Sequence, residues 1–102
     1  MNIIQNYINE HYKEKITLED LSRIAKISPF HLNRLFCLEI GITPYSYQIH
    51  KKIEKSKTLL LQTGSIADTA LEMGFTDQSH FTRFFKKIIG TTPGKFIKSN
   101  KS

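Results

Sequence analysis

The sequence contains nearly the same tetrapeptide twice, GITP at residues 41–44 and GTTP at residues 90–93. In each copy the glycine suits the left-handed residue that ends a helix, the threonine suits a helix N-cap, and the proline suits the first helical position. A similar apolar segment precedes each copy, LNRLFCLEI before the first and FTRFFKKII before the second, at an offset of 49 residues. We therefore predict two related units that end their longer helices at these tetrapeptides.

The spacing of apolar residues is helical along nearly the whole chain. They recur at steps of three and four, as in Phe81, Phe84 and Phe85. Thr17 and Ser65 each precede an aspartate by three residues, which fits a capping box at a helix start. We expect an all-α fold with seven helices, at about residues 2–12, 18–25, 29–40, 44–62, 66–73, 77–89 and 93–98.

Each unit combines a short helix, a tight turn and a longer helix, which is the outline of a helix-turn-helix. One extra residue enters the turn of the second unit. Within a single domain over residues 1–102 we predict a first helix-turn-helix subdomain (1–43), a linker helix (44–62) and a second helix-turn-helix subdomain (63–102). At 1.5 Å per residue the linker is roughly 28 Å long, comparable to the roughly 34 Å between successive major grooves of B-DNA.

The longer helix of a helix-turn-helix lies in the major groove and reads base edges. Opposite the apolar stripes, both longer helices carry residue types that pair with bases, and arginine recurs at the matching positions 34 and 83. A solvated polar face is the ordinary alternative, but the repeated arginine favours base reading. The predicted base-reading residues are Phe30, His31, Asn33 and Arg34 in the first unit, and Gln78, Ser79, Thr82 and Arg83 in the second.

The positive charge is concentrated in the second half of the chain. Residues 1–50 hold five basic and five acidic residues, whereas residues 51–102 hold ten and four, which gives the net charge of +6. This surplus favours a polyanion, either nucleic acid or an anionic membrane, although a basic surface kept for solubility is also common. The predicted phosphate contacts are Ser28 and Thr76, which we expect at helix N-termini, and Lys52, Lys86, Lys87 and Lys95.

Several classes of protein are disfavoured. No apolar run approaches the roughly 18 residues of a membrane span, and the N-terminus lacks the pattern of a secretory signal. The single cysteine, Cys37, fits a reducing cytoplasm, where we expect the protein. Neither this lone thiol nor the four scattered histidines form a metal-binding or catalytic pattern, so no enzyme activity and no cofactor are predicted.

The segment SIADTALEMGFTDQSHFTRFFKKIIGTTP resembles, nearly position by position, the signature of the AraC/XylS family of bacterial transcription regulators. The first unit, TLEDLSRIAKISPFHLNRLFCLEIGITP, is similar but looser. The resemblance implies a DNA-binding domain of seven helices, with base contacts from Phe30, Asn33, Arg34, Gln78, Ser79, Thr82 and Arg83. The chain departs from the family pattern in four places. Lys52 replaces a usual arginine and Ser56 a usual alanine, Lys26 occupies a glycine-like position, and Cys37 stands where a basic residue is frequent.

The expected partner is therefore double-stranded DNA, bound at an asymmetric site with the two reading helices in adjacent major grooves. RNA polymerase is a second partner that the resemblance suggests, because related activators contact it. A protein-interaction module that contacts RNA polymerase or another regulator without reading bases stays open as an alternative. Many family members carry a separate sensing and dimerising domain, so we expect this chain to act as a monomer, or as a dimer if such a domain is missing from it.

Overall fold

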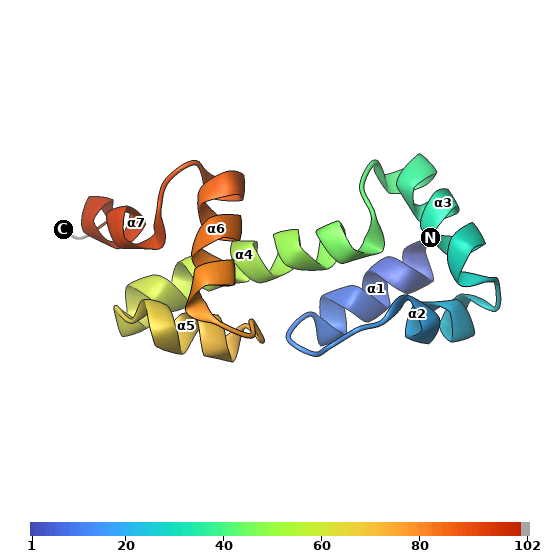
Figure 1. The fold of residues 1–102 in the computed structure, drawn as a ribbon, viewed down its shortest axis with the longest axis horizontal. Coiled ribbons are helices and arrows are strands. Elements are labelled where there is room, and N and C mark those ends of the chain that lie inside the picture. Colours follow the sequence, from blue (N-terminus) through green and yellow to red (C-terminus); the bar gives the residue numbers. More distant parts are fainter. Residues whose placement is uncertain (101–102) are drawn as a thin grey trace. The chain divides into compact units, whose positions relative to one another are not determined.

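A computed structural model of the chain describes residues 1–100. Across these residues the chain forms seven helices and no strand (Figure 1). The helices are α1 (Asn2–His11), α2 (Leu18–Ala25), α3 (Pro29–Ile40), α4 (Pro44–Thr63), α5 (Ile66–Glu72), α6 (Gln78–Ile89) and α7 (Pro93–Ser99). The predicted all-α fold is confirmed, and each boundary lies within one residue of its predicted position.

The contacts within the chain define two compact units, residues 1–51 and residues 52 onward. The boundary falls inside α4, so the first unit contains the start of this helix and the second unit contains the rest. The predicted three-part division treats the linker helix as a separate piece and stays a prediction. In the structure, the linker helix supplies packing residues to both units.

The first unit has a mainly aliphatic core. Its fully buried residues come from α1, α2 and α3 and are Ile4, Ile8, Leu21, Leu32 and Phe36. Phe36 also packs edge-on against Tyr47 of α4, with ring centroids 5.6 Å apart. This packing fixes the buried face of α3 and leaves the opposite face to solvent.

The second unit has an aromatic core built on α6. Phe81 and Phe85 are both 0% exposed. The Phe81 ring lies 5.3 Å from that of Phe75 in the turn before α6, and the Phe85 ring lies 5.4 Å from that of Phe96 in α7. Tilted and edge-on rings at these separations are favourable, so α6 is held from both of its ends.

The two Gly-x-Thr-Pro segments adopt the same backbone arrangement. Gly41 and Gly90 end α3 and α6 in the left-handed region, with φ of 96° and 97°. Thr43 Oγ1 accepts a hydrogen bond from the Ser46 amide at 3.1 Å, and Thr92 Oγ1 accepts one from the Lys95 amide at 3.2 Å. The predicted roles of glycine as helix end and threonine as N-cap are confirmed in both copies.

The two predicted capping boxes differ. At Thr17 the box is complete, because the Asp20 amide donates to Thr17 Oγ1 at 3.1 Å and the Thr17 amide donates to Asp20 Oδ2 at 3.0 Å. At Ser65 only the first half forms, with the Asp68 amide 3.1 Å from Ser65 Oγ. The Ser65 amide donates instead to Thr63 Oγ1, which takes the place that the Asp68 carboxylate would fill.

Candidate nucleic-acid interface

The outer face of α3 begins at its N-cap. Ser28 Oγ accepts a hydrogen bond from the His31 amide at 3.2 Å, which orients the first turn of the helix. Phe30 is 79% exposed, and His31 and Arg34 are also exposed. A phenylalanine this exposed gains nothing from the core, so its ring is available to an external partner.

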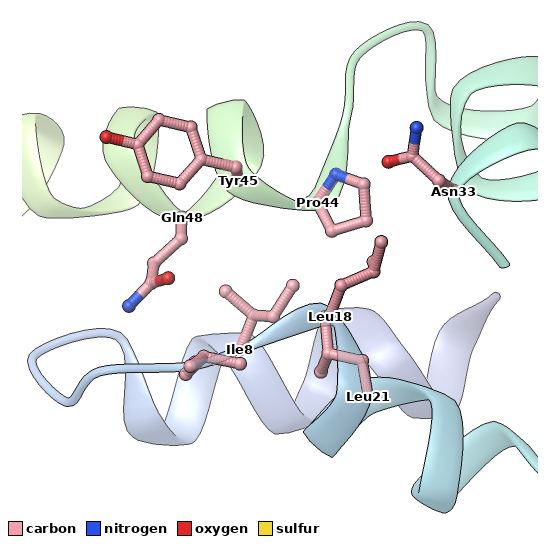
Figure 2. A pocket seen from close by; sticks show the side chains of 8 residues that line it. Ile8, Leu18, Leu21, Asn33, Pro44, Tyr45 and Gln48 are labelled. Carbon is pink, nitrogen blue, oxygen red and sulfur yellow. The ribbon is translucent and has the colours of Figure 1, made fainter. Parts of the chain in front are cut away.

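Asn33 differs from its exposed neighbours on α3. It is half-buried and lines a hollow of about 150 Å³ in the first unit, together with Leu18, Leu21 and Pro44. Figure 2 shows the Asn33 amide beside Pro44, at the edge of this hollow. Its position on α3 keeps it next to Arg34, but less of its side chain is available outside the protein.

The predicted residues of α6 lie together. Gln78, Ser79, Thr82 and Arg83 line one open hollow on the surface of the second unit. Gln78, Ser79 and Arg83 are exposed and Thr82 is half-buried, because Phe81 and Phe85 turn the other side of the helix into the core. Four polar side chains on two successive turns therefore present hydrogen-bond donors and acceptors on one face.

The start of α6 corrects one sequence expectation. Asp77, and not Thr76, is the N-cap, with its Oδ1 accepting a hydrogen bond from the His80 amide at 2.8 Å. Thr76 lies one residue earlier and is exposed. A carboxylate therefore occupies the positive end of the helix, and its charge opposes a phosphate there. The phosphate contact of Thr76 stays a prediction. The uncharged cap of α3, Ser28, carries no such repulsion.

The predicted basic contacts fall into two groups. Lys86 and Lys87 in the last turn of α6 and Lys95 in the first turn of α7 are exposed, as a phosphate contact requires. Lys52 is only 8% exposed, and its Nζ lies 3.5 Å from the carbonyl oxygen of Gly74. Burial lowers the pKa of Lys52 below the ordinary lysine value. The amine of Lys52 is thus engaged inside the second unit, and its phosphate contact stays a prediction.

The turns before α3 and α6 each contain one left-handed residue. In the first turn this is Lys26, with φ of 59°, and in the second it is Gly74, with φ of 82°. The position of Lys26, which the family resemblance gives as glycine-like, is thus left-handed in the structure. Because this conformation costs about 1–2 kcal/mol for a residue with a side chain, the surrounding turn must hold Lys26 there.

The described residues contain no group of three or more His, Cys, Asp or Glu that could hold a metal ion. Over the same part of the chain, none of the helices has the length and apolar character needed to cross a membrane. The exposed faces of α3 and α6 offer hydrogen bonding, stacking and positive charge to a partner.

Two short-helix, turn, long-helix units, each with an arginine on the exposed face of its long helix, define a helix-turn-helix protein. Residues 21–99 match the helix-turn-helix domain family. The chain belongs to the AraC-type helix-turn-helix family, whose domains bind DNA.

Known proteins are similar to this chain in sequence and in fold. The bifunctional transcriptional activator/DNA repair enzyme AdaA of Bacillus subtilis is 35% identical over 99% of this chain and 48% of its own length. The C-terminal domain of AraT, a response regulator from Geobacillus stearothermophilus, has a TM-score of 0.89 and 28% identity, covering 99% of this chain and 85% of that one. The DNA-binding domain of AdpA, solved with a target DNA, has a TM-score of 0.83 at 22% identity, covering 96% and 89%. The chain spans about half the length of AdaA.

Proposed function

We propose that the chain is the DNA-reading part of a bacterial transcription regulator. In this proposal α3 and α6 enter adjacent major grooves of one asymmetric double-stranded site. The observation that carries the proposal is the exposed face of α6, where Gln78, Ser79, Thr82 and Arg83 line one hollow. The membership of the AraC-type family and the DNA complex of AdpA support it.

The chemistry of these side chains suits base edges in the major groove. Arg83 and Arg34 each present two donors that match O6 and N7 of guanine, and Gln78 matches N6 and N7 of adenine. The methyl group of Thr82 and the exposed ring of Phe30 suit the methyl group of thymine. Sequence discrimination would therefore be distributed over both helices.

Phosphate contacts would supply much of the affinity. Lys86, Lys87 and Lys95 are exposed in the second unit, and the N-terminus of α3 at Ser28 carries a partial positive charge. Together with the net charge of +6, this predicts binding that weakens steeply as salt is added.

The length of α4 supports the use of two grooves by one chain. With 20 residues it is about 30 Å long, close to the 34–36 Å that separates successive major grooves on one side of B-DNA. Because α3 and α6 differ in sequence, the site should be asymmetric. Such a protein would work as a monomer in the bacterial cytoplasm, and contacts with RNA polymerase would come from surfaces that DNA leaves free.

Alanine substitution of the two arginines tests base reading. Preferred sites are selected from random duplexes, and Arg34→Ala and Arg83→Ala are then measured on those sites. Each variant should lose about 1–3 kcal/mol of binding free energy and relax the preference at its own base pairs. The matched control is Lys98→Ala, which removes one exposed charge on α7 and should weaken binding to all sequences alike.

Two results would contradict the proposal in different ways. Wild-type affinity and wild-type base preferences in both arginine variants would show that these helices do not read bases. Failure of the wild-type protein to bind any duplex at about 50 mM salt would favour the protein-interaction module, because phosphate contacts are strongest at low salt.

A further inference from the structure

Lys52 has unusual surroundings for a lysine on a linker helix. Its side chain extends from α4 to the turn between α5 and α6, where Nζ lies 3.5 Å from the Gly74 carbonyl oxygen and 5.0 Å from the centroid of the Phe75 ring. With 8% exposure it is among the buried polar residues of the chain. Lysine is rarely buried unless its charge has partners, and here the partners are a carbonyl dipole and an aromatic face.

The turn that Lys52 contacts satisfies its own amide groups. The Gly74 amide donates to the Leu71 carbonyl and the Phe75 amide donates to the Ala70 carbonyl, both at 3.0 Å. This pair of bonds is the Schellman arrangement that ends a helix on a left-handed glycine. The Gly74 carbonyl takes no part in that arrangement and is the group to which Lys52 donates.

Phe75 connects this turn to the reading helix. Its ring lies 5.3 Å from that of Phe81 and 6.3 Å from that of Phe84, both on α6. The residues of α6 that line the exposed hollow, from Gln78 to Arg83, lie on the same two turns of helix as these rings. A displacement of Phe75 would therefore move the proposed DNA-reading face.

We propose that Lys52 is a positioning residue for the second reading helix. By holding the Gly74 carbonyl and the Phe75 ring, it determines where α6 begins and how α6 presents its exposed face to DNA. This inference rests on the proposed function and assigns Lys52 a role distinct from phosphate contact.

The test compares three variants on two duplexes. Lys52→Met keeps the unbranched apolar stem and removes the charge, Lys52→Arg restores a donor, and Lys55→Met is the control on an exposed lysine of the same helix. One duplex carries the selected site; in the other, the base pairs at which Arg83→Ala loses preference are scrambled. Binding is measured at several salt concentrations.

On the selected site, Lys52→Met should bind about tenfold more weakly, which corresponds to the loss of one good base contact. On the scrambled duplex it should bind like the wild type, and its slope of log K against log salt should be unchanged. Lys52→Arg should recover most of the affinity. A slope reduced by about one unit, with equal loss on both duplexes, would make Lys52 a phosphate contact and overturn the proposal.

Phe75→Leu is a second, independent variant that removes the ring face and retains an apolar side chain. It should show the same duplex-specific loss and should not add to that of Lys52→Met, because both act through one contact. If Lys52→Met does not fold, Phe75→Leu decides the outcome. Wild-type affinity of Phe75→Leu on both duplexes, or an equal loss on both, would reject the positioning role of Lys52.

Amide chemical shifts of the free protein separate this inference from the proposed function. Shifts from Gln78 to Arg83 should change in Lys52→Met, return towards wild type in Lys52→Arg, and stay constant in Lys55→Met. If these shifts move but no variant binds DNA, the proposed function fails while the positioning role of Lys52 stands. Unchanged shifts in Lys52→Met would overturn the positioning role itself.

Discussion

The turns of the two helix-turn-helix units each contain one left-handed residue but are supported from different places. In the first, the Ser22 hydroxyl on α2 donates to the carbonyl of Ile27, a contact within five residues. In the second, Ala70 occupies the position that matches Ser22 and has no hydroxyl, and the Gly74 carbonyl is bound by Lys52 from α4, 22 residues earlier. The first turn is thus supported locally, whereas the second adds a contact from the linker helix to its own local hydrogen bonds.

The cores differ in a similar way. The first unit packs isoleucine and leucine from three helices around Phe36, so its buried surface is divided among many side chains. The second unit adds the rings of Phe75, Phe81, Phe85 and Phe96 to buried aliphatic residues such as Ile53 and Leu60. Because each aromatic ring buries a large area, these four rings should contribute much of the stability of the second unit.

The largest effects should come from Phe36→Ala and Phe85→Ala, which occupy matching positions and are both 0% exposed. Each should cost about 3–5 kcal/mol, since the cavity adds to the lost burial. Amide hydrogen exchange measured helix by helix should show Phe36→Ala acting mainly on α1 to α3 and Phe85→Ala mainly on α5 to α7. Equal loss of protection in all helices after either substitution would mean that the two cores unfold together and not as separate units.

An intermediate effect on stability is expected from substituting the left-handed residue of each turn. Gly74→Ala should destabilise the chain by about 1–2 kcal/mol, because alanine carries the steric penalty of positive φ. Lys26→Gly should instead stabilise it by about 0.5–1 kcal/mol, after the entropy of glycine in the unfolded chain is subtracted. Denaturant unfolding measures both. A loss of stability in Lys26→Gly would show that the lysine side chain itself supports the first turn.

The smallest effects concern the caps of the two short helices. Thr17→Ala removes the hydroxyl of a complete capping box and should cost about 1 kcal/mol, whereas Ser65→Ala should cost about 0.5 kcal/mol. Urea unfolding of the two variants, with Ser99→Ala on α7 as a surface control, gives both values. A larger loss for Ser65→Ala would contradict the ranking of the two caps.

The complete capping box at Thr17 should also make the stability of α2 depend on pH. The Thr17 amide, followed by the Thr17 hydroxyl, lowers the pKa of Asp20 in the folded protein. This contribution is therefore present above the ordinary aspartate pKa of about 3.9 and is lost as the pH falls through the lowered value. Amide protection in α2 should decrease over that acidic range, and Asp20→Asn should remove the dependence.

The helices could be predicted from the sequence because their ends are specified locally. Gly41 and Gly90, each followed by threonine and proline, predict a left-handed helix end and a new helix start. The structure adopts this backbone at both places. The polar face of α6 was equally accessible to prediction, since helical periodicity assigns Phe81 and Phe85 to the core and Arg83 to the outside.

Other features depend on tertiary contacts that the sequence does not specify. The sequence favours a surface charge at Lys52, because its partners Gly74 and Phe75 lie more than 20 residues later and become neighbours only after folding. The choice of Asp77 over Thr76 as N-cap is a local ambiguity, since both residue types cap helices well. The half-buried setting of Asn33 depends on Pro44 and Leu18, which α4 and α2 bring beside it.

The Gly-x-Thr-Pro segment is a connector whose geometry does not depend on the helix that it introduces. The same four-residue pattern leads into α4, with 20 residues, and into α7, with 7, and the capping hydrogen bonds differ in length by only 0.1 Å. The length of the outgoing helix is therefore not set by the connector. For protein engineering this makes Pro93 a natural graft point, where a copy of the α4 segment could lead into a third helix-turn-helix unit.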